Sequence, residues 1–170
     1  MAWVIVPRGG PNERAAVTVR LIYIGGYSRS GSTLLLRMLG EMPGLLPVGE
    51  LFDLWQRSYI ENQRCGCGNF FQDCAFWREV TVRAFGANLE EIDSQSLQAM
   101  RKRVQGYARI PQLWLPLLRS RSYKSELPDY IGVLSRLYQA INEDSNASYI
   151  VDSSKCLFLN LSGGGPGGGS

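Results

Sequence analysis

The chain contains no histidine among its 170 residues. This absence excludes Ser-His-Asp and Cys-His nucleophilic catalysis by these residues, and it excludes histidine-ligated metal chemistry. A general base in this chain must therefore be an aspartate, a glutamate, a lysine or a less common group.

Excess charge and long apolar runs are also lacking. The 18 basic and 15 acidic residues leave a net charge of only +3, too little to indicate nucleic-acid binding. Residues 101–124 are basic without any acidic residue, which favours a solvated helix face over an anionic-substrate patch. The apolar opening, residues 2–6, is too short for a signal peptide core or a membrane span. We therefore expect a cytoplasmic protein that binds neither nucleic acid nor membrane.

The composition is otherwise that of an ordinary globular domain, with 45% hydrophobic and 19% charged residues. Only residues 162–170, Ser-Gly-Gly-Gly-Pro-Gly-Gly-Gly-Ser, depart from it, since they offer no side chain that could bury area. We expect one domain over residues 1–161 and a flexible tail over 162–170.

Apolar segments alternate with helical patterns along this domain. Residues 16–25 and 147–152 are nearly continuous in hydrophobicity, which predicts buried strands, and 45–48 could form a shorter one. Helical patterns lie at 32–41, 51–59, 77–84 and 89–107, and from Leu127 apolar residues follow an amphipathic helical spacing. This order predicts an α/β three-layer domain with a parallel sheet and a helical insert.

A glycine-containing loop joins the first predicted strand to the first helix. Gly26-Tyr-Ser-Arg-Ser-Gly31-Ser32-Thr33 has the spacing of a Walker A loop, but Ser32 stands in the position of its lysine. That lysine contacts the β and γ phosphates in triphosphatases. Backbone amides, hydroxyls and a helix start favour a smaller anion instead, with Arg29 as the cation. A glycine turn with a Ser/Thr helix cap is the alternative.

Residues 27–35, Tyr-Ser-Arg-Ser-Gly-Ser-Thr-Leu-Leu, resemble the 5′-phosphosulfate loop of sulfotransferases. The resemblance implies a P-loop-like fold and in-line transfer of a sulfonate from 3′-phosphoadenosine 5′-phosphosulfate (PAPS) to an acceptor hydroxyl or amine, without a metal. The acceptor would be a small molecule, a carbohydrate or a peptide. The donor-binding residues implied are Ser28, Arg29, Ser30, Gly31, Ser32, Thr33 and Leu34.

Two further segments supply candidate catalytic groups. Glu50, in Pro-Val-Gly-Glu-Leu, stands where related sulfotransferases carry a catalytic glutamate, and we expect it to act as the base. A solvated glutamate at a helix start is the alternative. Lys155 follows the strand that ends at Asp152, and the resemblance gives it, with Arg29, the role of stabilising the leaving oxygen. Ser153 and Ser154 would orient the leaving oxygen. The alternative for Lys155 is a surface lysine that follows a strand and has no catalytic role.

Three cysteines, Cys65, Cys67 and Cys74, lie within one predicted loop. Their C-x-C spacing and the missing histidine fall short of a standard zinc site, so we expect no metal. The loop resembles those of bacterial-type sulfotransferases and is interpreted as structural. Zinc, a single disulfide and free thiols all stay open.

The resemblance covers residues 19–159 but lacks the Arg-Asp-Pro-Arg-like segment that binds the 3′-phosphate of PAPS in the family. We therefore expect a C-terminally truncated sulfotransferase domain. One alternative is a P-loop kinase-like phosphotransferase, in which Asp152 would hold Mg²⁺. Another is a catalytically inactive binding module.

Overall fold

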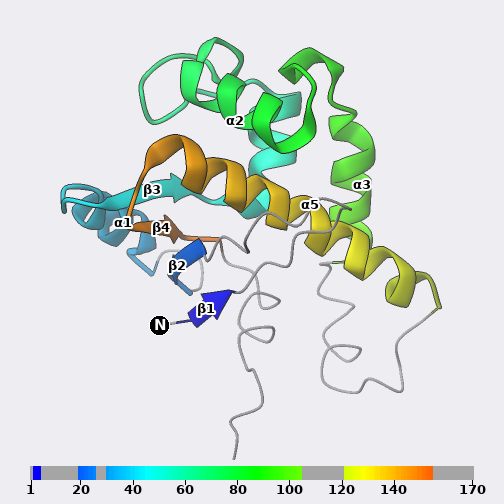
Figure 1. Ribbon diagram of the computed structural model, residues 1–170, viewed down its shortest axis with the longest axis horizontal. Coiled ribbons are helices and arrows are strands. Elements are labelled where there is room, and N and C mark those ends of the chain that lie inside the picture. The colour runs from blue at the N-terminus through cyan, green and yellow to red at the C-terminus, as the bar shows by residue number, and fades with distance from the viewer. Residues whose placement is uncertain (1, 5–18, 26–29, 105–120, 155–170) are drawn as a thin grey trace, which may run out of the picture. The chain divides into compact units, whose positions relative to one another are not determined.

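The computed structural model describes residues 2–4, 19–25, 30–104 and 121–154, with the backbone alone for 2–4 and 121–125 (Figure 1). Contacts divide the chain into two compact units. The first combines Met1–Phe52 with Ile141–Ser170, and the second is Asp53–Ala140. Strands and helices are both present, which confirms the predicted α/β class.

The first unit contains a sheet of four described strands, β1 Ala2–Val4, β2 Val19–Tyr23, β3 Leu45–Gly49 and β4 Tyr149–Asp152. Their order is β1-β2-β4-β3. β4 pairs in parallel with both neighbours, so that Ile150 lies opposite Leu21 on one side and Leu46 on the other. β1 pairs antiparallel with β2 at the edge, and the sequence pattern did not predict it.

The predicted strands form because their apolar residues fill the centre of this sheet. Ile150 and Val151 of β4 are fully buried, and Val19 and Leu21 of β2 are nearly so. A strand flanked by parallel neighbours is covered on both faces, which explains its continuous rather than alternating hydrophobicity. The three parallel strands confirm the sequence-based prediction.

Helix α1, Ser32–Gly40, follows the loop after β2 and packs against β3 and β4. Its helical pattern was predicted correctly, and several of its apolar side chains are exposed: Leu34 is 65% exposed, Leu35 45% and Met38 61%. Ser32 is the one buried residue of α1. Periodicity specifies a helix, whereas burial depends on a neighbouring element that the sequence pattern does not identify.

The second unit is helical. The turn η1, Leu51–Asp53, spans the junction between the two units. The described elements after it are η2 Leu54–Ile60, η3 Phe71–Asp73, α2 Ala75–Phe85, η4 Leu89–Glu91, α3 Ser94–Val104 and α5 Arg121–Ser145 (Figure 1). The last residues of α5, from Ile141, belong to the first unit. η1 is a 3₁₀ turn and η2 is π-helical, where a regular helix was expected. No helix in the described part of the chain has the length and apolarity needed to cross a membrane.

The helix predicted over 89–107 is divided into two. Asn88 and Glu91 form a capping box around η4, and the Asp93 carboxylate accepts the Ser96 amide at 3.0 Å, just before α3 begins. Side-chain acceptors of this kind end one segment and start the next. Residues beyond 104 in the predicted range lie outside the described residues.

Aromatic rings form the centre of the second unit. Trp55 is fully buried, with its ring 5.1 Å from that of Tyr59. The Tyr59 ring lies 4.9 Å from Phe71, and Phe71 lies 5.4 Å from Trp77. These tilted contacts connect η2, η3 and α2, so one cluster holds three short elements together.

An ion pair adds α3 to this unit. The Arg101 guanidinium lies 2.9 Å from the Asp53 carboxylate, and Arg57 approaches the same carboxylate at 3.5 Å. The Arg101 side chain is only 10% exposed, so a neutral replacement of Asp53 would leave a largely buried cation without its main partner.

The hydroxyl of Tyr59 links stability to alkaline pH. It hydrogen-bonds the Thr81 hydroxyl at 2.7 Å, and burial raises the pKa of Tyr59 to about 12 from 10.0. Because the folded-state pKa is raised, the neutral form's contribution is complete below pH 10 and is lost as pH rises towards 12. We expect roughly 2–3 kcal/mol of stability to disappear over this window. Urea unfolding at pH 9 to 12, compared with Tyr59→Phe, measures it; equal slopes in both proteins would contradict the assignment.

Candidate functional site

The carboxyl ends of β2, β3 and β4 meet at one edge of the sheet, because the three strands are parallel. Ligands of open α/β sheets bind at this edge. The Ile24 amide donates to the Asp152 carbonyl at 2.8 Å, which joins the end of β2 to the end of β4. The segments predicted to carry donor and catalytic groups therefore leave neighbouring strands on the same side.

Two serines join the end of β4 to the end of β3. The amide and the hydroxyl of Ser153 both donate to the Gly49 carbonyl, at 2.9 and 3.1 Å. The Ser154 hydroxyl accepts the Phe52 amide at 2.8 Å. Glu50 lies between these two anchored positions, so the structure brings it together with Ser153 and Ser154. Both serines are almost fully buried, and their hydroxyls bind backbone groups.

The backbone at Gly49 turns the chain towards Glu50. The register of β3 with β4 shifts between Pro47 and Gly49, and Gly49 has φ +81°. A residue with a Cβ is strained at this angle, which explains the glycine before Glu50. Irregularities of this kind redirect side chains at strand ends. Glu50 itself is half-buried.

Asp152 organises the turn after β4. Its side chain is fully buried, and the carboxylate accepts the Ser154 amide at 2.7 Å. This is the local turn that aspartate forms with the amide two residues later. The Asp-Ser-Ser sequence after an apolar strand carries the signal for such a turn.

Gly31 starts α1 at the end of the predicted anion loop. It has φ +77°, and its carbonyl accepts the Leu35 amide at 3.0 Å, the first helical hydrogen bond. The amides of the first helical turn have no acceptor within the helix, and glycine has no side chain to cap them. This end of α1 therefore presents backbone donors and the positive end of its dipole.

The other residues of the predicted donor loop are only partly placed. Ser30 and Thr33 are exposed, like Leu34, whereas Ser32 is 5% exposed. Ser28, Arg29 and Lys155 lie outside the described residues. The structure thus describes the start of α1, the strand ends and Glu50. The two predicted cations, Arg29 and Lys155, and the neighbouring Ser28 are not among the described residues.

Comparisons with known proteins give no match. No protein-family model, no curated protein and no solved structure matches the chain.

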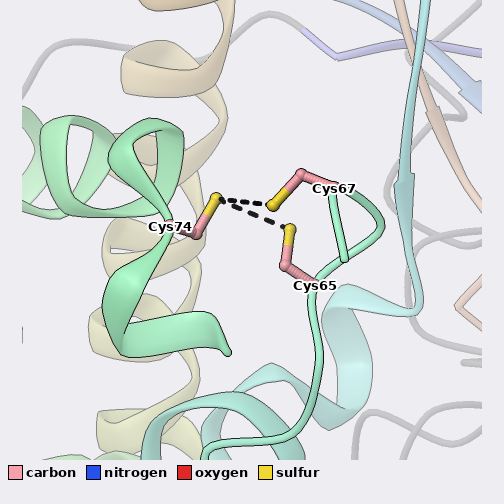
Figure 2. Close-up of side chains that lie close together, drawn as sticks. All are labelled: Cys65, Cys67 and Cys74. Carbon is pink, nitrogen blue, oxygen red and sulfur yellow. Dashed lines mark hydrogen bonds between the residues drawn. The ribbon is translucent and has the colours of Figure 1, made fainter. Parts of the chain in front are cut away.

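A second constellation lies in the helical unit, where three cysteine side chains point toward one another (Figure 2). Cys65 and Cys67 belong to one loop, and Cys74 immediately precedes α2. The Sγ of Cys74 lies 3.6 Å from that of Cys65 and 3.7 Å from that of Cys67, and all three are free thiols. A hydrogen bond from the backbone of Asn69 lowers the pKa of Cys67, whereas burial raises the pKa of Cys74 to about 11. The sequence predicted one loop but not this convergence.

Proposed function

We propose that this chain is a PAPS-dependent sulfotransferase domain of P-loop-like fold, which transfers a sulfonate group to an acceptor hydroxyl or amine. One observation carries the proposal: two features meet at the same edge of the sheet. Helix α1 follows β2 and starts at Gly31 without a side-chain cap. Directly after the neighbouring strand β4, Ser153 and Ser154 anchor the backbone on either side of Glu50. An anion site and a carboxylate thus follow strands of one sheet edge.

The start of α1 supports binding of the 5′-phosphosulfate. First-turn amides and the helix dipole favour an anion, and the hydroxyls of Ser30, Ser32 and Thr33 belong to the same segment. Arg29 and Ser28, just before it, would complete the loop. Because Ser32 replaces the Walker lysine, the loop suits a phosphosulfate better than a Mg²⁺-bound triphosphate.

Glu50 is the proposed base. It accepts the acceptor's proton as the acceptor oxygen or nitrogen forms its bond to sulfur, while the bond from sulfur to the bridging oxygen of PAPS breaks. Negative charge then develops on that bridging oxygen, and Lys155 and Arg29 stabilise it. A charge pair at about 4 Å is worth about 4 kcal/mol at an effective dielectric constant of about 20, enough for a large rate effect.

Ser153 and Ser154 act in this proposal mainly by positioning. Their hydroxyls bind the Gly49 carbonyl and the Phe52 amide, and these bonds fix the backbone on either side of Glu50. Lys155 is the next residue in the sequence. The buried Asp152 carboxylate binds the Ser154 amide, which counts against a kinase-like role for it as a Mg²⁺ ligand.

Ligand-induced thermal shifts test donor binding. We expect adenosine 3′,5′-bisphosphate, at a hundredfold excess over Kd, to raise Tm by roughly 5–10 °C. Arg29→Ala should reduce the shift, and Arg37→Ala, at the other end of α1, should leave it unchanged. Stabilisation by ATP with Mg²⁺ but not by the bisphosphate would refute the proposal in favour of a phosphotransferase.

Transfer itself is measured with radiolabelled PAPS and a panel of phenol, sugar and peptide acceptors. Labelled product with any acceptor class supports the enzyme and identifies its substrate class. Bisphosphate binding without transfer to any of them would favour the inactive binding module.

A further inference from the structure

The cysteine cluster of the second unit has no role in sulfonate transfer as proposed above. The distances between its sulfur atoms nevertheless match those of a metal site. Around a tetrahedral Zn²⁺ with Zn–S bonds of about 2.3 Å, neighbouring sulfur atoms lie about 3.8 Å apart. The Cys74 sulfur lies 3.6 and 3.7 Å from its two neighbours, and all three sulfurs lie within 4.8 Å of one another. The three thiols therefore occupy nearly the spacing of three corners of such a tetrahedron.

We propose that Cys65, Cys67 and Cys74 form a thiolate site for a zinc-class ion that stabilises the helical unit. Sulfur ligands in a tetrahedral arrangement select Zn²⁺ among the common divalent ions. Within the described residues, no further cysteine, aspartate or glutamate belongs to the group. The fourth ligand in this proposal is water or a small added ligand.

Backbone hydrogen bonds fix the two segments that carry these sulfurs. The Cys65 amide donates to the Asn69 carbonyl at 2.8 Å, and the Gly68 amide donates to the Cys65 carbonyl at 2.9 Å. Gly68 has φ +92°, an angle that favours glycine and lets the loop return within a few residues. On the other side, the Cys74 carbonyl accepts the Arg78 amide at 3.0 Å as α2 begins. A preorganised set of ligands lowers the entropic cost of binding.

Charge is compatible with an ion at this place. Three thiolates and one divalent cation leave a net charge of −1. The guanidinium of Arg64 is fixed in the same loop, because it donates to the Gly68 carbonyl at 2.8 Å and lies over the Phe70 ring at 4.8 Å. The loop that carries Cys65 and Cys67 thus also carries a cation.

An ion here would connect two segments of the aromatic core. Phe71 lies between the cysteine pair and Cys74 in sequence, and Trp77 lies in the first turn of α2. Closing residues 65–74 around a metal would restrict both rings in the folded state. The ion therefore acts as a structural clamp within the helical unit.

The direct test uses the full chain under reducing conditions and needs no activity. Reduced, metal-free protein is titrated with Co²⁺, which reports thiolate ligation through a sulfur-to-metal charge-transfer band, and then with Zn²⁺. We expect one ion per chain, the charge-transfer band, its loss on addition of Zn²⁺, and a rise in Tm of roughly 5–10 °C at saturating Zn²⁺.

Variants assign the ligands. Cys67→Ser is the principal variant because Cys67 is exposed, and it should abolish the band and the Zn²⁺-dependent rise in Tm. Cys156→Ser, which changes the cysteine outside the cluster, should retain both. If Cys67→Ser fails to fold, the titration of the unmodified chain still decides. The absence of the band, or a band that survives Cys67→Ser, overturns the proposal, as does a disulfide among the three cysteines that persists in the reduced cytosol of the expression host.

Discussion

Replacing Glu50 with glutamine should lower the rate of sulfonate transfer by about 10²–10⁴-fold, the range lost when a general base is removed. Glutamine keeps the size and polarity of the side chain but cannot accept the acceptor's proton at neutral pH. The backbone around the residue is fixed by Ser153 and Ser154, so we expect no change in fold. Single-turnover assays with radiolabelled PAPS measure the rate.

Glu41→Gln serves as the matched control. Glu41 is an exposed glutamate at the end of α1, so its loss should leave transfer close to that of the unmodified protein. Binding of adenosine 3′,5′-bisphosphate should be nearly unchanged in both variants, because the base contacts the acceptor rather than the donor. Transfer by Glu50→Gln at more than a tenth of the original rate would remove Glu50 from the mechanism.

Trp55→Ala should lower the free energy of unfolding by about 3–5 kcal/mol, the usual result of truncating a buried aromatic side chain. The Trp55 side chain is fully buried, and its ring contacts those of Tyr59 and Phe85. Alanine would leave a cavity between η2 and α2 and would remove both ring contacts. Urea unfolding followed by far-ultraviolet circular dichroism measures the loss without depending on tryptophan fluorescence.

Val82→Ala provides the comparison for this variant. Val82 lies on α2 but is 43% exposed, so its truncation should change stability by at most about 0.5 kcal/mol. If Trp55→Ala were as mild as Val82→Ala, Trp55 would not form part of the core of the helical unit.

The strands of the sheet were predictable because their hydrophobicity is nearly continuous. Residues 16–25 contain β2, 45–48 contain most of β3, and 147–152 contain β4. β1 was not predicted, since it has three residues and depends on pairing with β2 rather than on a pattern of its own. Strand identity is thus local information, whereas the pairing of an edge strand is not.

The candidate site was predictable to a similar degree. The glycine pattern predicted a loop followed by a helix from Ser32, and α1 begins at Ser32 after Gly31. The sequence could not reveal that the Ser154 hydroxyl binds the Phe52 amide, because these residues are 102 positions apart. Nor could the helical pattern of α1 reveal which of its residues are covered, and Leu34 is exposed. The roles of Glu50, Arg29 and Lys155 stay predictions.

The position of β4 in the sheet has a consequence for the order of folding. β4 separates β2 from β3, yet it is the last of the four described strands in the chain. During synthesis neither β2 nor β3 has its parallel partner until residues 149–152 leave the ribosome, whereas Asp53–Ala140 is continuous and complete by then. Closing such a long loop is slow compared with local helix formation. The catalytic edge proposed above is therefore assembled late, after the unit that contains the cysteine cluster.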